Sequence, residues 1–417
     1  MTVPEPAAPG TPSTGRPLLA VFSATFFVRF AFGITVAVLA SYISGQSSVF
    51  GQQEVGVVGV VAALAPVGEF STVLLSGAAA DRYGRFPVLF GGIGSAAVIF
   101  VLISLTREPY LLAGANLLFG VSSGAILASS LAIVADHSAT LERGLEMGRF
   151  DAMNLSGWIA GFAFGLGVKG AVPNSSLGLA FLLGSALLAG GLGFALLLLR
   201  GRPVDHGHPA YSFSEVARHI FRRSVLLVTL PWLVIYMLIG TALVFLGTAA
   251  SGIGIPSLEL AAIIGGAGFV LVLTQPTFGR LADRFGRMRM MTLGAAGFVM
   301  VMVLASFIVA FGPKVPFLVG LGVSVLAALA YGPAALAALA DLSLEISRAT
   351  TMAIYSLTIS LGMLVGLLAF TQLFSRLGDL GLYIFFAAVA VTLVTLTVGR
   401  LADLRGAGGD RPTTPVR

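Results

Sequence analysis

Twelve long apolar runs constrain this chain more than any other feature of its sequence. Each run is long enough to cross a bilayer as an α-helix, which takes about 20 mostly apolar residues. Only helices and closed barrels satisfy their backbone hydrogen bonds in lipid, and runs of this length are too long for barrel strands. The sequence therefore predicts an all-α membrane protein with twelve transmembrane helices. The runs lie at residues 17–44, 54–80, 86–106, 109–135, 147–168, 177–199, 224–250, 258–280, 287–311, 315–340, 349–374 and 379–402.

The composition excludes the main soluble classes of protein. Hydrophobic residues make up 57% of the 417 residues and charged residues 10%, against about 25% charged in soluble domains. Too few charges remain to cover the surface of a soluble enzyme or a nucleic-acid-binding domain. The sequence has no cysteine, no phosphate-binding loop and no histidine cluster with metal-ligand spacing. We therefore expect no enzymatic activity, no cofactor and no metal site.

The basic residues indicate how the chain crosses the membrane. With the N-terminus inside, nineteen of the 24 Lys and Arg residues fall on the side of both chain ends, four fall on the other side, and Arg29 lies within a run. Short loops rich in Lys and Arg stay in the cytoplasm. The sequence thus predicts a multi-pass protein of the cell (cytoplasmic) membrane with both termini cytoplasmic. The same distribution explains the net charge of +6 without a nucleic-acid partner.

A polar stretch in the middle of the chain divides the twelve runs into six and six. The predicted organisation is a disordered cytoplasmic tail over 1–16, a six-helix bundle over 17–199, a cytoplasmic linker over 200–223, a second six-helix bundle over 224–402 and a disordered cytoplasmic tail over 403–417.

Two sequence blocks occur once in each half, in the same order. The first, G-x-x-x-D-R-x-G-R, begins at Gly77 and again at Gly279, an offset of 202. Two parallel halves of this kind are related by an axis along the membrane normal and place a substrate site between them. The sequence therefore predicts two pseudo-symmetric halves. In the second block, at an offset of 205, Asp136, Arg143, Met147, Gly157 and Gly161 match Asp341, Arg348, Met352, Gly362 and Gly366.

The first block, present twice in a twelve-span chain, resembles the loop signature of the major facilitator superfamily. This resemblance covers residues 17–402 and implies a secondary transporter whose halves rock around a central cavity. The glycines permit close helix approach, and the aspartates can cap a helix and attract arginines. A cytoplasmic gate is one interpretation of the block, and arginines that only fix topology are the other. The gate residues are Gly77, Asp81, Arg82, Gly84, Arg85, Gly279, Asp283, Arg284, Gly286 and Arg287.

Two departures from family patterns concern the mode of transport. Proton-coupled members often carry an arginine four residues before a glycine in span four, where this chain has Asn116 before Gly120. Drug/proton antiporters often have a proline and a further glycine in span five, where this chain has Phe162 and Leu166. The resemblance therefore supports the superfamily but not the drug antiporters specifically.

Arg29 and Glu69 are the charged residues expected near the bilayer centre. Each lies 12 residues from the cytoplasmic end of its run, or about 18 Å along a helix. A charge at that depth needs a partner or a wet cavity, so we expect Arg29 and Glu69 to pair. In the functional interpretation Glu69 takes up and releases a proton, while Arg29 adjusts the pKa of Glu69 or binds an anionic group of the substrate. In the alternative interpretation the two residues form a permanent ion pair that only holds two helices together. Asp151 is expected at the mouth of span five, and a role as a partner of Arg149 or of loop arginines is favoured over proton transfer.

Six polar or aromatic residues at middle depth are candidates to line the cavity. They favour an amphipathic or aromatic ligand, and the nearby Tyr331-Gly332-Pro333 is expected to kink span ten. These candidates are Asn154, Trp158, Tyr236, Gln275, Tyr331 and Tyr355.

The sequence thus favours a secondary active transporter that moves a small organic solute across the membrane by alternating access, with proton-coupled efflux of a partly hydrophobic compound as the preferred mode. One alternative is an organic-anion or metabolite symporter that uses Arg29. A different class, a non-transporting membrane sensor or receptor on the same scaffold, also stays open. The expected partners are a small-molecule substrate, a coupling proton and the lipid bilayer, and the chain is expected to act as a monomer.

Overall fold

The computed structural model describes residues 15–44, 54–106, 108–138, 142–199, 222–252, 257–312, 314–342 and 348–409, and all regular elements in these ranges are helices. The first half contains α1 (Gly15–Ser44), α2 (Glu54–Tyr83), α3 (Arg85–Leu105), α4 (Pro109–His137), α5 (Arg143–Ala171), the short 3-10 helix η2 (Asn174–Ser176) and α6 (Gly178–Leu198). The second half contains α8 (Arg223–Gly252), α9 (Ser257–Phe285), α10 (Arg287–Phe311), α11 (Val315–Ala328), α12 (Tyr331–Leu342), α13 (Arg348–Leu377) and α14 (Asp379–Gly409).

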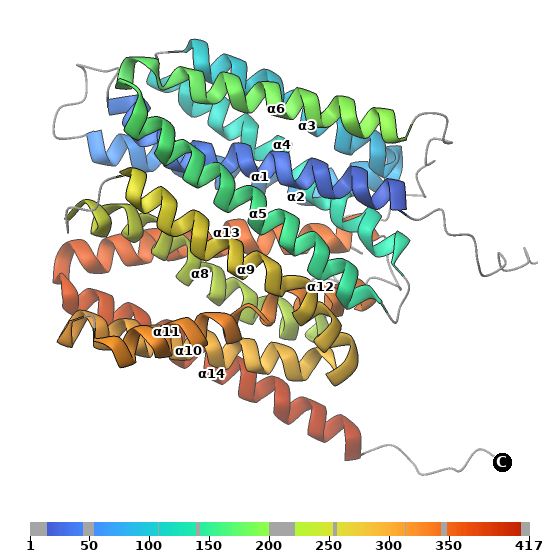
Figure 1. Cartoon of the computed structure of the whole chain (residues 1–417). Coiled ribbons are helices and arrows are strands. Elements are labelled where there is room, and N and C mark those ends of the chain that lie inside the picture. Colours follow the sequence, from blue (N-terminus) through green and yellow to red (C-terminus); the bar gives the residue numbers. More distant parts are fainter. Residues whose placement is uncertain are drawn as a thin grey trace, which may run out of the picture.

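The two halves form two helical bundles that lie side by side, with their helices running in roughly the same direction (Figure 1). Helix α5 of the first half packs along α9 of the second, and α2 packs along α13. These two helix pairs form the seams between the halves. A site between the halves is therefore built from α2, α5, α9 and α13 and from the helices behind them.

Ten helical segments in the described ranges are long and apolar enough to cross a membrane, and α11 and α12 count together as one of them. Helices α5 and α9 are the other two long helices. They are more polar because they pack against the opposite half at a seam and need not present a fully apolar surface to lipid. The architecture is thus twelve spans in two six-helix halves, as the sequence predicted.

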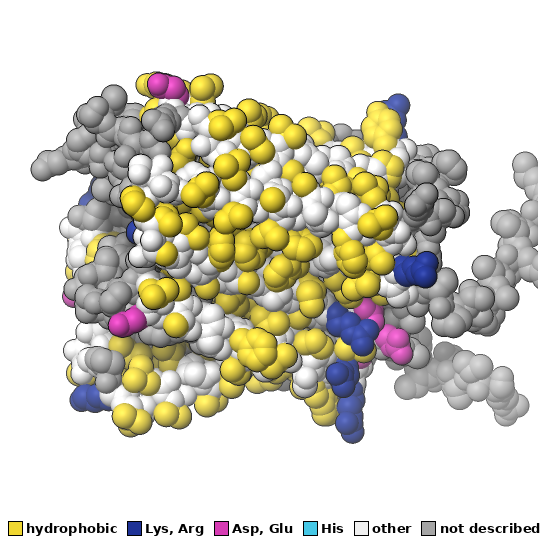
Figure 2. All heavy atoms as spheres, turned by 45° about the horizontal axis from the view of Figure 1, so that its top comes forward, with side chains coloured by type: hydrophobic (Ala, Val, Ile, Leu, Met, Phe, Trp, Pro, Cys, Tyr) yellow, Lys and Arg dark blue, Asp and Glu magenta, His cyan; other side chains and the backbone are white. Residues whose placement is uncertain are grey.

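The surface agrees with a membrane-embedded bundle. Figure 2 shows apolar side chains over the middle of the molecule and most of the charged side chains at its two ends. One end carries Arg85, Arg143 and Arg287, each at the first residue of a helix. The start of α1 and the end of α14 lie at this same end (Figure 1). We call it the arginine-rich end.

The helix boundaries confirm some sequence expectations and correct others. Span ten is broken between α11 and α12, as expected, because Pro333 has no N–H to continue the helical hydrogen bonds. Helix α14 continues to Gly409, so the prediction of disorder from residue 403 is wrong up to that point. Helix α1 begins at Gly15 rather than at residue 17. The rest of both predicted tails and residues 200–221 of the predicted linker lie outside the described residues.

The repeated glycines pack equivalent helices in the two halves. A Cβ atom on Gly161 of α5 would lie 2.0 Å from the carbonyl oxygen of Phe30 in α1. A Cβ atom on Gly366 of α13 would lie 2.2 Å from the carbonyl oxygen of Met237 in α8. Both distances are far below contact distance, so both helix pairs cross at positions that only glycine fits. The internal repeat in the sequence therefore corresponds to a repeat in packing.

Candidate functional site

At the arginine-rich end, Asp283 of α9 caps the N-terminus of α5 in the opposite half. Its Oδ1 accepts a hydrogen bond from the backbone N–H of Gly144 at 2.9 Å, and its Oδ2 accepts one from Leu145 at 3.0 Å. Glu142, at the N-cap position of α5, makes no capping bond with its side chain. The first N–H groups of a helix have no partner within the helix and attract negative charge. The second half therefore supplies the cap that α5 lacks.

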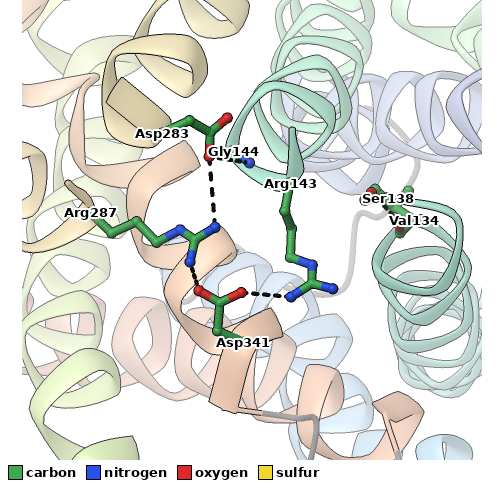
Figure 3. A network of polar contacts seen from close by, with 7 residues as sticks. All are labelled: Val134, Ser138, Arg143, Gly144, Asp283, Arg287 and Asp341. Atoms are coloured by element: carbon green, nitrogen blue, oxygen red, sulfur yellow. Dashed lines mark hydrogen bonds and ion pairs between the residues drawn. The ribbon is translucent and has the colours of Figure 1, made fainter. Parts of the chain in front are cut away.

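Arginines extend this contact across the seam, as Figure 3 shows. Nη1 of Arg143 in α5 donates to Oδ1 of Asp341 in α12 at 2.6 Å. Nη1 of Arg287 pairs with Oδ2 of Asp341, and Nη2 of Arg287 lies 3.7 Å from Oδ1 of Asp283. One aspartate thus bridges arginines from both halves, and the two halves are joined at this end.

The first half contains an equivalent cluster. Nη1 of Arg85 lies 2.8 Å from Oδ2 of Asp136, and Nη2 of Arg85 lies 3.8 Å from Asp81. Asp81, Arg85 and Asp136 correspond by the sequence repeat to Asp283, Arg287 and Asp341. The counterpart of Arg143 is Arg348, whose side chain lies outside the described part of the structure.

The remaining gate residues divide into backbone positions and exposed arginines. Gly84 and Gly286 are single-residue connections with φ of 98° and 95°, a conformation that glycine adopts without strain. A Cβ atom on Gly279 would lie 2.2 Å from the carbonyl oxygen of Gly144, so α5 and α9 touch there; Gly77 is buried. Arg82 and Arg284 are exposed and lie over the neighbouring rings of Tyr83 and Phe285, outside the network.

Glu69 lies in the middle of α2, at the other seam. It is 3% exposed, and its Oε1 accepts a hydrogen bond from the Ser356 hydroxyl of α13. Arg29 instead donates from Nε to Oδ1 of Asn154 at 2.7 Å. In the described part of the chain, Arg29 and Glu69 form no ion pair. The predicted pair is therefore absent, because each side chain has a polar partner on a different helix.

Asp151 lies elsewhere than the sequence suggested. Arg149 pairs with Glu146 at 2.5 Å rather than with Asp151. Oδ2 of Asp151 lies only 2.5 Å from where a Cβ atom on Gly332 would be, at the break between α11 and α12. Its carboxylate also interacts with the Asn154 side chain and with the charge of Arg29. Asp151 is thus part of a central polar cluster between the halves, which we define as Arg29, Asp151, Asn154, Tyr236 and Tyr355.

The second half contributes the two tyrosines of the central cluster. The hydroxyl groups of Tyr236 in α8 and Tyr355 in α13 lie 3.3 Å apart, and both interact electrostatically with Asp151 and Arg29. The ring of Trp232 packs edge-on to Tyr355 with centroids 4.5 Å apart. The first half therefore supplies the charges, and the second half supplies an aromatic wall.

The other cavity and coupling candidates have packing contacts outside the central cluster. Trp158 stacks on Phe162 within α5, with parallel rings and centroids 5.8 Å apart. Tyr331 is 1% exposed and bonds to the carbonyl oxygen of Val228 inside the second half. Gln275 is buried in α9, at the seam with α5, and Asn116 of α4 donates to the carbonyl oxygen of Val61 in α2 at 2.6 Å.

Sequence reasoning missed three functional candidates. Asp341 and Arg143 belong to the second repeated block, so their duplication was a usable signal. Ser356 had no signal, because one serine in an apolar helix is common, and its contact with Glu69 depends on how α2 and α13 meet.

Comparison with known proteins agrees with this arrangement. The family model described as the Major Facilitator Superfamily matches residues 21–257 and 233–415. The chain belongs to this superfamily. It is therefore a membrane transporter rather than an enzyme, consistent with two duplicated halves joined at one end and a polar cluster between them.

Two relatives are informative. The chain is 34% identical over 107 residues to the tetracycline resistance protein, class D, of Salmonella ordonez; the match spans 26% of this chain and 27% of that protein, about a quarter of its length. The fold matches the crystal structure of the human organic anion transporter MFSD10 (TETRAN) with a TM-score of 0.76 at 17% identity, over 93% of this chain and 100% of that chain.

Proposed function

We propose that this transporter exports a small, partly hydrophobic compound across the cytoplasmic membrane in exchange for protons, with Glu69 as the proton-carrying residue. The observation that carries the proposal is the hydrogen bond from Ser356 of α13 to Glu69 of α2. It places a buried carboxylate of one half directly against the other half. Separation of the halves would leave this carboxylate without its donor, and a proton would then remove the cost of the charge.

The arginine-rich end acts as the inner gate in this proposal. The positive-inside rule supports a cytoplasmic position for this end and for both chain termini. The cap from Asp283 and the bridge through Asp341 hold the cytoplasmic side closed, and breaking them opens the cavity inward. Similarity to a protein named for resistance to tetracycline favours export over import.

Transport into inverted membrane vesicles tests the proposal. With an acidic lumen and tetracycline as the first probe, the wild-type protein should accumulate the probe against its gradient. Glu69→Gln should abolish this accumulation and retain exchange of labelled for unlabelled probe, because exchange needs no net proton movement. Glu108→Gln, an exposed carboxylate beyond the end of α3, is the matched control and should behave as wild type. Undiminished accumulation by Glu69→Gln would remove Glu69 from the coupling.

The organic-anion alternative rests on Arg29, a buried guanidinium at the centre of α1. It predicts transport of simple organic carboxylates that depends on Arg29 and survives Glu69→Gln. The same vesicles with labelled carboxylates distinguish the two proposals.

A further inference from the structure

The central cluster contains two opposite charges that are close in space but not paired. Arg29 and Asp151 both contact the side chain of Asn154, which lies one helical turn after Asp151. Oδ1 of Asn154 accepts from Nε of Arg29 at 2.7 Å, and the same side chain interacts with the Asp151 carboxylate. Within the described residues, no ion pair joins Arg29 to Asp151. The protein therefore holds the two charges apart at the centre of the molecule.

Each of the two charged groups has unused capacity to bind. Arg29 is 6% exposed, and among the described residues its two terminal nitrogens have no hydrogen-bond acceptor. Asp151 presents its carboxylate to the backbone of Gly332 across the seam, and neither oxygen forms an ion pair with a described side chain. Asp151 is half-buried, and neither its oxygens nor the terminal nitrogens of Arg29 are among the fully buried polar atoms that lack a partner. Both groups therefore keep some access, and a ligand that contacts both would complete their partial hydrogen bonding.

The opposite wall of the cluster is aromatic. The hydroxyl groups of Tyr236 and Tyr355 lie 3.3 Å apart and interact electrostatically with Asp151 and Arg29. Trp232 stacks on Tyr236 with ring centroids 6.3 Å apart. Such a wall suits a flat apolar body, while the few polar groups fix its orientation. A singly charged ligand would satisfy one of Arg29 and Asp151 and be repelled by the other.

We propose that the central cluster selects zwitterionic compounds with an aromatic or other flat apolar body. The anionic group of the ligand binds Arg29, its cationic group binds Asp151, and its apolar body lies against Tyr236, Tyr355 and Trp232. Asn154 is a positioning residue that keeps the two charges from collapsing onto each other. This inference rests on the proposed function, because it assigns the substrate class of the same transport site.

Equilibrium binding to the purified full-length protein tests the charge preference. Three probes share a phenyl ring and differ in charge at neutral pH: phenylalanine is a zwitterion, phenethylamine a cation and 3-phenylpropionate an anion. The chain has two tryptophans; Trp232 packs against Tyr236 and Tyr355 of the cluster, and Trp158 lies one helical turn after Asn154 in α5, so intrinsic fluorescence reports binding. We expect the zwitterion to bind at least about tenfold more tightly than either singly charged probe, as one charge-assisted contact allows.

Substitutions should change the preference in a way that a purely structural role would not. Asp151→Asn should make the anion bind at least as well as the zwitterion, and Arg29→Gln should do the same for the cation. Asn154→Ala keeps both charges and should lose the zwitterion preference, because Arg29 is then free to pair with Asp151. Glu108→Gln, far from the cluster, should keep the wild-type order of affinities. If Arg29→Gln does not fold, the Asp151 and Asn154 variants still decide the question.

Two results would overturn the proposal. One is a wild-type protein that binds none of the three probes or prefers a singly charged probe. The other is an order of affinities that the Asp151 and Asn154 substitutions leave unchanged. The binding assay imposes no proton gradient, so its result is independent of proton coupling. If only the charge preference were absent, the vesicle assay would still show proton-driven accumulation.

Discussion

Removing the cap that Asp283 provides should open the arginine-rich end. Asp283→Ala deletes two hydrogen bonds, of 2.9 and 3.0 Å, from Gly144 and Leu145 across the seam. Loss of a capping side chain costs about 0.5–2 kcal/mol, and Glu142 makes no capping bond that could replace it. The cost falls only on the conformation in which the halves touch at this end. If the closed conformation loses about 1–2 kcal/mol of stabilisation relative to the open one, the closed-to-open ratio falls by about 5–30-fold.

Distances between spin labels measure this shift. The chain has no cysteine, so labels can be placed at Tyr83→Cys and Phe285→Cys alone. These positions end α2 and α9 on opposite halves and are 63% and 49% exposed. Asp283→Ala should increase the population at long distance. The control is Asp379→Ala, because Asp379 is exposed in the first turn of α14 at the opposite end. This substitution should leave the distance distribution unchanged. Equal distance distributions for wild type and Asp283→Ala would refute the reasoning.

Three further substitutions follow from the same contacts. Arg143→Gln removes the 2.6 Å bond to Asp341 and should lengthen the same label distance, whereas the exposed Arg82→Gln should leave it unchanged; no change in the first variant would contradict the bridge. Gly161→Ala forces a Cβ atom to 2.0 Å from the carbonyl oxygen of Phe30 and should lower stability by about 1–3 kcal/mol in thermal unfolding. Gly114→Ala, with open space around it, is the control, and equal melting temperatures would argue against the close crossing. Tyr42→Phe removes hydrogen bonds to the carbonyl oxygens of Ile103 and Thr106, at 3.1 and 3.0 Å, and should cost about 1 kcal/mol, while Tyr110→Phe, 85% exposed, should cost nothing measurable.

The architecture was predictable because it depends on local properties of the sequence. A run of about 20 apolar residues must become a helix in lipid. The Tyr331-Gly332-Pro333 sequence lies at the break between α11 and α12, although Pro66, Pro231 and Pro276 lie inside continuous helices. The duplicated blocks predicted two equivalent halves, and the packing of Gly161 and Gly366 shows why those glycines occur twice. The end of α14 was less predictable, since residues beyond the apolar run can remain helical.

The central cluster was only partly predictable, because it depends on which helix faces pair across the seams. Counting residues along α1 and α2 gave Arg29 and Glu69 similar depths but not their orientations, so the ion pair that depth suggested does not form. The position of Asp151 next to Arg149 favoured an interfacial partner. Its actual neighbour, Gly332, is almost two hundred residues away in the chain, and no local pattern indicates that contact.

The most direct test of proton-coupled transport is to follow protons while a compound gradient is the only driving force. Proteoliposomes carry a pH-sensitive dye in the lumen, and the compound transported in the vesicle assay is added outside at equal internal and external pH. Exchange predicts that the lumen becomes alkaline in the wild type, because protons leave as the compound enters. Glu69→Gln should leave the luminal pH unchanged, and with unlabelled compound already inside it should still exchange labelled compound. Entry of the compound into wild-type vesicles without alkalinisation would contradict proton coupling.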